Sequence, residues 1–129
     1  MALVPAGHEL VPFSAVSLAD VVAFPMIACH PDHEPGMRQQ TDSIVRKYAV
    51  APVIAGEASS LTGLINRVGA GLGVGLVDRG HLDTLNRTDV VALPLAEDVR
   101  IATCVLHKHQ RFGLPDALQR FLAHVKNQN

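Results

Sequence analysis

The sequence has few aromatic side chains and no excess of charge of either sign. Tryptophan is absent, aromatic residues make up 4% of the 129 residues, and 11 Lys and Arg stand against 12 Asp and Glu. Domains that bind nucleic acid directly need a cationic surplus against phosphate and often use aromatic side chains to stack on bases. This composition therefore argues against a nucleic-acid-binding domain within the chain.

Cysteines and long apolar runs are equally scarce. Cys29 and Cys104 are the only cysteines, and two thiols in a chain of this length do not form a disulfide framework. No apolar run approaches the roughly 18 residues of a membrane span. The first residues also lack the basic and apolar regions of a secretory signal. We therefore expect a cytoplasmic protein without membrane contacts.

What the chain does contain is enough apolar material for one folded domain. Hydrophobic residues make up 48% of the sequence and charged residues 18%, which excludes disorder. Short apolar runs alternate with segments of helical periodicity, an order that predicts an α/β fold with a parallel-rich sheet flanked by helices. The predicted strands cover residues 21–29, 53–55, 73–77, 90–93 and 101–106, and the predicted helices cover 37–48, 61–72, 81–85 and a segment after 115.

Capping residues mark the starts of several helices. Ser17 can cap a short helical turn, and Ser59 or Ser60 can cap the helix predicted over 61–72. That helix has an apolar stripe at i, i+3, i+4, i+7 and i+11 and is expected to end at its glycines. Pro115 marks the start of a terminal helix. The stripes consist of Leu61, Leu64, Ile65, Val68 and Leu72 in one helix and Leu118, Phe121, Leu122 and Val125 in the other.

The glycine-rich segment 69–75 is similar to a nucleotide-binding loop only at first sight. It has neither the dinucleotide spacing nor a Gly-Lys-Ser/Thr ending. It also leads from a helix into a strand, whereas a phosphate loop needs the reverse order. We interpret it as close packing of a helix against a strand through small residues.

Cysteines and histidines gather in two places, which raises the possibility of a metal site or of a nucleophilic thiol. The spacing fits no zinc motif, and residues three apart on a strand face opposite sides. We therefore expect no metal, no cofactor and no catalytic residue, and we expect both cysteines to be small core residues. A small stand-alone enzyme that uses Cys29 and a histidine remains the alternative. The two groups are Cys29, His30 and His33, and Cys104, His107 and His109.

The segment Glu57–Ser60 carries a more specific signal, because it follows a strand and opens a helix. The N-terminus of a helix exposes free N–H groups and a positive partial charge, so two serines there can bind a carboxylate or a similar anion. Plain N-capping explains the same residues. The two interpretations are compatible, since one serine can cap while the other binds.

Several of these segments together resemble the effector-binding domain of LysR-type transcriptional regulators. The resemblance covers nearly all of the chain, and its most specific part is the glycine-rich passage from helix to strand. It rests on Ser17–Val21 with Phe24–Ile27, on Glu57–Leu61, on Val68–Val77, on Leu3–Leu10 as a crossover, and on Val91–Leu95.

The resemblance implies a regulatory subdomain with a fold like that of periplasmic binding proteins. Family members carry an N-terminal winged helix-turn-helix, bind a small effector between two α/β subdomains, and form oligomers. We expect residues 1–11 to cross over from a first subdomain outside this chain, 12–98 to form the second subdomain, and 99–129 to return to the first. DNA would then be bound only through a domain that this chain lacks. A piece of a solute-binding protein of similar fold is a further alternative.

The family's pattern also implies which residues face the effector. Ser59 and Ser60 would hold a polar or anionic group, and His30 would add a hydrogen bond or a charge. Asp78 stands where the family usually has proline; its carboxylate either disfavours an anionic effector or caps the following helix. The full set is Ala28, Cys29, His30, Glu57, Ala58, Ser59, Ser60, Val77 and Asp78.

Overall fold

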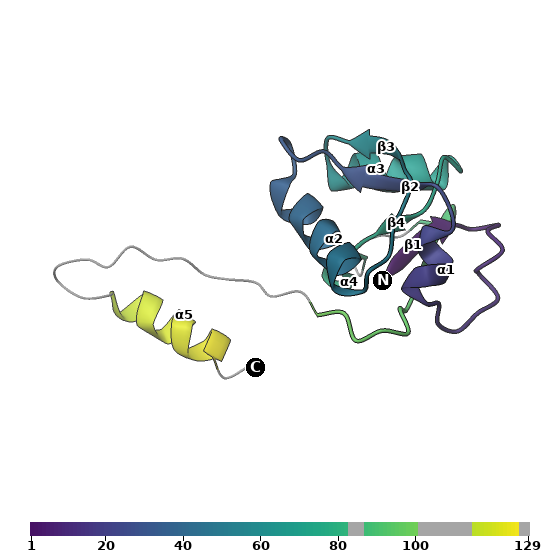
Figure 1. Ribbon diagram of the computed structural model, residues 1–129. Coiled ribbons are helices and arrows are strands. Elements are labelled where there is room, and N and C mark those ends of the chain that lie inside the picture. Colours follow the sequence, from purple (N-terminus) through teal and green to yellow (C-terminus); the bar gives the residue numbers. More distant parts are fainter. Residues whose placement is uncertain (83–86, 101–114, 127–129) are drawn as a thin grey trace.

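Strands and helices alternate along the chain, as the sequence predicts. The structure, a computed structural model, describes residues 1–82, 87–100 and 115–126 (Figure 1). The elements are β1 (Ala2–Pro5), α1 (Leu18–Val22), β2 (Met26–Cys29), α2 (Pro35–Lys47), β3 (Ile54–Ala58), α3 (Leu61–Gly69), β4 (Gly75–Leu76), α4 (Arg79–Leu82), β5 (Val90–Leu93) and α5 (Asp116–Lys126).

The strands form a mixed sheet in which all described strands but β1 run in one direction. β1 runs antiparallel to β4 and β5, and β2 runs parallel to β3. A parallel bridge between Met26 and Val74 joins the two groups of strands. The described order is therefore β3-β2-β4-β1-β5, with β1 alone in the opposite direction. This arrangement confirms the predicted α/β fold with a parallel-rich mixed sheet.

Helices cover both faces of the sheet, so the core lies in two layers. Because side chains alternate along a strand, Ala2 and Val4 pack in the cluster that contains the buried residues of α1. Leu3 packs in the other cluster, with the buried residues of α3. Ile44 of α2 and Tyr48, which follows this helix, join the α1 side. α2 and α3 both flank the sheet, so α2 and the N-terminus of α3 lie near the same strands.

The predicted caps are confirmed where the structure describes them. Ser17 forms a reciprocal capping box with Asp20 at the start of α1. At the start of α3 it is Ser60 that caps, because its hydroxyl oxygen accepts a hydrogen bond from Gly63 N at 3.0 Å. The predicted stripe of α3 is buried at Leu64, Ile65 and Val68.

The prediction of one strand over 21–29 was wrong. Val21 belongs to α1, which the capping box starts, and β2 begins only at Met26, after Pro25. An apolar run that contains a proline is therefore split between a helix and a strand. The apolar content of the run reflects burial and does not distinguish the two structures.

Other boundaries also differ from the predictions: β3 covers Ile54–Ala58 where 53–55 was predicted, and α2 covers Pro35–Lys47 where 37–48 was predicted. α3 ends at Gly69, and Leu72 is 56% exposed because the chain turns at Gly71 with φ of 75°. β4 is limited to Gly75–Leu76, and α4 begins at Arg79. The predicted strand 101–106 and the residues Cys104, His107 and His109 lie outside the described residues. No described helix is long and apolar enough to cross a membrane.

Glycines at the start of β4 allow close approach, as we interpreted them from the sequence. Gly73 has φ of 157°, and a Cβ atom there would lie 2.5 Å from the backbone oxygen of Pro25. A Cβ on Gly75 would lie 2.9 Å from Leu64 Cδ2 of α3. The first contact brings β4 against β2, and the second brings α3 against β4.

We predict that Gly73→Ala lowers the free energy of unfolding by about 2 kcal/mol, because the added methyl group would push β4 away from Pro25. Urea denaturation measures this change. Gly36→Ala is the matched control, since nothing lies within 4 Å of a Cβ at that helical position and alanine favours helix. Equal stability of Gly73→Ala and the wild type would show that the contact with Pro25 is not tight.

Candidate functional site

The carboxyl ends of β2, β3 and β4 lie at one edge of the sheet. Cys29 pairs with Ala58 in the β2–β3 register, and His30 N donates a hydrogen bond to Ala58 O at 2.8 Å. β4 ends on the other side of β2, where Val77 N donates to Met1 O at 3.1 Å. The structure therefore brings the ends that carry the predicted site residues to a common edge.

The predicted residues fall into a buried and an accessible set. Ala28, Cys29, Ala58 and Val77 are at most 4% exposed, so they form the wall beneath the edge. The side chains of His30 and Glu57 are 35% and 37% exposed. The buried set shapes the site, and the accessible residues are those that can reach a ligand: His30, Glu57, Ser59, Ser60 and Asp78.

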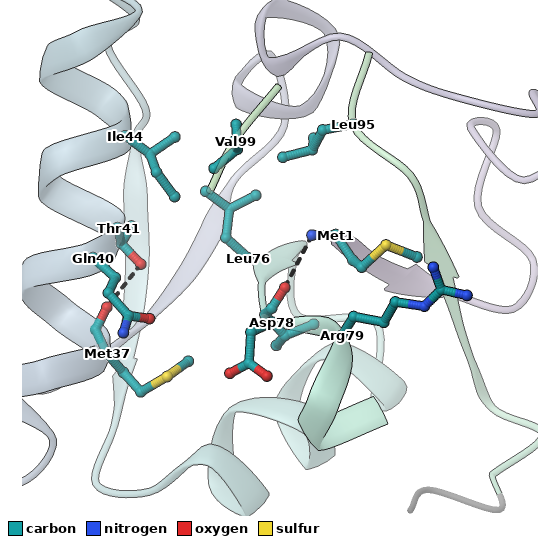
Figure 2. A pocket seen from close by; sticks show the side chains of 11 residues that line it. Met1, Met37, Gln40, Thr41, Ile44, Leu76, Asp78, Arg79, Leu95 and Val99 are labelled. Atoms are coloured by element: carbon teal, nitrogen blue, oxygen red, sulfur yellow. Dashed lines mark hydrogen bonds between the residues drawn. The ribbon is translucent and has the colours of Figure 1, made fainter. Parts of the chain in front are cut away.

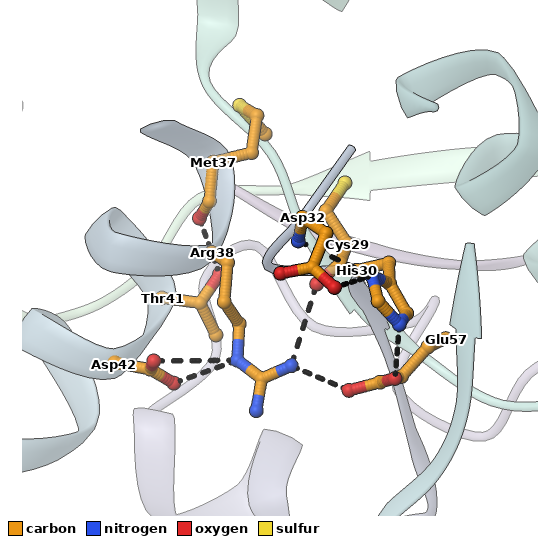
Figure 3. A network of polar contacts seen from close by, with 8 residues as sticks. All are labelled: Cys29, His30, Asp32, Met37, Arg38, Thr41, Asp42 and Glu57. Atoms are coloured by element: carbon orange, nitrogen blue, oxygen red, sulfur yellow. Dashed lines mark hydrogen bonds and ion pairs between the residues drawn. The ribbon is translucent and has the colours of Figure 1, made fainter. Parts of the chain in front are cut away.

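A polar network ties α2 to the ends of β2 and β3 (Figure 3). Arg38 Nη1 donates to Glu57 Oε1 at 2.6 Å and to the backbone oxygen of Cys29 at 3.4 Å. Arg38 Nε donates to Asp42 Oδ1 at 3.1 Å. His30 Nε2 lies 3.7 Å from Glu57 Oε2. The hydrogen bonds that Arg38 donates to Glu57 and Asp42 raise the pKa of Arg38, so the guanidinium is a permanent cation that fixes the Glu57 carboxylate.

Sequence reasoning missed Arg38. The i, i+4 spacing of Arg38 and Asp42 is a readable signal of an ion pair on a helix. The partner at the sheet, Glu57, is 19 residues away in sequence, and no local pattern connects the two. Only the parallel pairing of β2 and β3 brings Glu57 under α2.

The two serines at the start of α3 have different roles. Ser60 is engaged as the cap. Ser59 is exposed, and its hydroxyl makes no hydrogen bond to the part of the chain that the structure describes. The first N–H groups of α3 have no partner within the helix, as at every helix start. Ser59 and this turn can therefore donate to an anion while Ser60 holds the helix end in place.

A pocket of about 340 Å³ opens between α2 and the end of β4 (Figure 2). The predicted residues Val77 and Asp78 line it, together with one face of α2. Most of its wall is apolar. The complete lining is Met1, Met37, Gln40, Thr41, Ile44, Leu76, Val77, Asp78, Arg79, Leu95 and Val99.

Asp78 both caps α4 and faces the pocket. Its Oδ1 accepts a hydrogen bond from His81 N at 3.1 Å, and its Oδ2 lies 2.5 Å from His81 Nδ1. Burial alone would raise the pKa of Asp78, but the hydrogen bonds from the His81 side chain and from the His81 and Gly80 backbone outweigh it and lower the pKa. The carboxylate is therefore ionised at neutral pH.

The Cys29 thiol is poorly suited to nucleophilic chemistry. It is 2% exposed and free, and burial together with the charge of Glu34 raises its pKa. A raised pKa keeps the thiol protonated, whereas a nucleophilic cysteine needs a thiolate. His30 and His33 contact each other edge to face with ring centroids 4.9 Å apart. Within residues 1–82, 87–100 and 115–126, no group of three or more His, Cys, Asp or Glu could hold a metal ion.

Comparison with known proteins places these features in a family. The family model of the LysR substrate binding domain matches residues 1–129. The chain is 25% identical over 127 residues to the HTH-type transcriptional regulator YnfL of Escherichia coli (strain K12), covering 98% of this chain and 42% of YnfL. The chain thus spans less than half the length of this relative.

Solved structures agree with the family match. HinK, a LysR family transcriptional regulator from Pseudomonas aeruginosa, is 29% identical with a TM-score of 0.72, covering 98% of this chain and 43% of HinK. The effector binding domain of BenM with its effector benzoate has a TM-score of 0.67 at 20% identity, covering 76% of this chain and 45% of that one. BenM shows the fold alone. These matches favour a regulator over a solute-binding protein.

We predict that Cys29 reacts slowly with iodoacetamide near neutral pH, because its thiol is buried and protonated. The measurement is the alkylation rate by mass spectrometry in a Cys104→Ser background, so that only Cys29 can react. The same chain unfolded in urea is the control, and its rate should be at least about tenfold faster. Rapid alkylation of the folded chain would revive the hypothesis of a small thiol enzyme.

Proposed function

The chain belongs to the LysR substrate-binding domain family, and on that premise we propose that it senses a small organic effector for a DNA-binding transcriptional regulator. Residues 12–98 would form the second regulatory subdomain, with 1–11 and 99–129 as the segments that connect it to the first. DNA contact would come from a winged helix-turn-helix elsewhere in the regulator, which would work in the cytoplasm.

One observation carries this proposal: several strands end at one edge, and their ends carry accessible polar groups above a buried wall. In open α/β sheets, ligands bind outside the carboxyl ends of the strands. His30 follows β2, and Ser59 follows β3. Both can reach the same ligand because β2 and β3 are hydrogen-bonded neighbours.

The chemistry of this edge favours a polar or anionic group on the effector. Ser59 and the first N–H groups of α3 are donors, and the helix end carries positive partial charge. His30 adds a donor or, when protonated, a cation. Arg38 holds the Glu57 carboxylate beside His30. No covalent step is needed, so the edge would bind the effector without changing it.

Effector binding would act through a shift of population. A ligand held between this edge and a facing subdomain stabilises the arrangement in which both contact it. That change in subdomain geometry would then alter a homo-oligomer on DNA. The response depends on how differently the effector contacts the two arrangements of the subdomains. Substitution of a residue that touches the effector should therefore change the response and leave the DNA affinity without effector unchanged.

We predict that Ser59→Ala in the full-length regulator weakens the response to a small carboxylate effector at least about tenfold, because a hydrogen bond to a charged group is lost. Ser60→Asp keeps an N-cap but places a negative charge at the site, and should abolish the response. Effectors are first found by screening small carboxylates, and the response is measured as effector-dependent DNA binding.

Ser43→Ala, on an exposed position of α2, is the matched control and should respond as the wild type does. DNA binding without effector should be the same in all four proteins. If the effector titrations of Ser59→Ala and Ser60→Asp coincide with that of the wild type, the start of α3 does not contact the effector.

A further inference from the structure

A carboxylate lies beside the serine that we propose to contact the effector. Glu57 is in the last turn of chain before β3 ends, and Ser59 follows two residues later, so their Cα atoms are at most about 7 Å apart. Both residues are exposed, whereas Ala58 between them is buried. A separation of this size is shorter than the Debye length, about 10 Å at 0.1 M salt. An unpaired Glu57 would therefore repel an anion bound at Ser59.

Arg38 is the cation that pairs with this carboxylate. Its Nη1 donates to Glu57 Oε1 at 2.6 Å, and Figure 3 shows the guanidinium between the carboxylates of Glu57 and Asp42. The same nitrogen donates to the backbone oxygen of Cys29 at 3.4 Å, which fixes the guanidinium to the end of β2. The Arg38 side chain is 23% exposed, so water screens this pair less than a pair on the open surface.

The other charged groups of this network do not offset the charge of Glu57. Asp42 accepts from Arg38 Nε at 3.1 Å and is itself negative. Asp32 is also negative, and its side chain is 86% exposed. His30 Nε2 lies 3.7 Å from Glu57 Oε2, but a histidine is ordinarily neutral above pH 7. Of the ion pairs that the described residues make with Glu57, only the one with Arg38 therefore supplies a permanent cation.

We infer that Arg38 is a positioning residue that allows the edge to accept an anion. By pairing with Glu57, it offsets the repulsion that this carboxylate would exert at Ser59 and at the first N–H groups of α3. Arg38 acts through Glu57 and does not need to touch the effector. The inference rests on the proposed function, since it explains how the serine site tolerates a neighbouring carboxylate. Without Arg38, the charges of Glu57 and Asp42 stand unopposed, and the edge should bind anions less well.

The test measures how tightly this chain binds acetate, a carboxylate with almost no apolar body. Sodium chloride is replaced stepwise by sodium acetate at pH 7.5 and constant ionic strength, and NMR follows the backbone amides of Leu61–Gly63 in the first turn of α3. Arg38→Gln should weaken acetate binding about fivefold, the effect of one unpaired charge about 7 Å away near a protein surface. Arg38→Lys keeps the charge but not the fork of donors, so it should weaken binding less than Arg38→Gln does.

A double variant separates the charge of Arg38 from its structural contacts. Arg38→Gln/Glu57→Gln lacks both charges, so its acetate affinity should return to within about twofold of that of the wild type. If Arg38 only held α2 against the sheet, the double variant would bind as weakly as Arg38→Gln. Arg46→Gln is the matched control, because it removes the same charge from an exposed position of α2 and should bind acetate as the wild type does. Circular dichroism confirms that each variant is folded.

Three results would overturn the inference: equal acetate affinity of Arg38→Gln and the wild type, a double variant as weak as Arg38→Gln, or no shift of the α3 amides at about 100 mM acetate. Failure of the proposed function gives a different result. A weaker effector response in Ser59→Ala, with unchanged acetate binding in Arg38→Gln, would refute the role of Arg38 alone. The expected acetate affinities, with a normal effector response in Ser59→Ala and Ser60→Asp, would support the role of Arg38 and refute the serine site for the effector.

Discussion

The close approach of Gly73 to Pro25 determines the geometry of the whole edge. It allows Val74 N to donate to Pro25 O at 2.9 Å and Ile27 N to donate to Val74 O at 2.8 Å. These hydrogen bonds join β2–β3 to β4-β1-β5. A two-stranded pair has little stability alone, so β2 and β3 depend on this junction. It also brings the end of β4, with Asp78, beside the end of β2, with His30.

α2 connects the two chemically distinct halves of that edge. Arg38 and Asp42, one turn apart, face the polar network of β2 and β3. Met37 and Ile44 line the apolar pocket at β4. Successive residues of one helix therefore serve both regions, which follows from the angular spacing of residues around a helix. The position of α2 is set by contacts with both halves at once.

Local signals in the sequence were sufficient for the elements but not for the contacts between them. The caps at Ser17 and Ser60 and the stripe of α3 obey rules that span a few residues, so they were predictable. Apolar runs were ambiguous, because α1 and β2 are both buried and only residues 23–25, which include Pro25, separate them. The predicted residues reached the edge because each lies at the end of a strand or just after it. The Arg38–Glu57 pair and the pocket required the register of the sheet and segments far apart in the chain.

The arrangement of reactive groups at this edge suits recognition better than reaction. General bases and nucleophiles need a free lone pair or a thiolate beside the reacting atom. Here the Cys29 thiol is buried with a raised pKa, Glu57 is held by Arg38, and Asp78 caps α4. Each group is fixed by a neighbour and presents a defined donor, acceptor or charge. Fixed polar groups over an apolar wall discriminate ligands by charge and shape, as effector sensing requires.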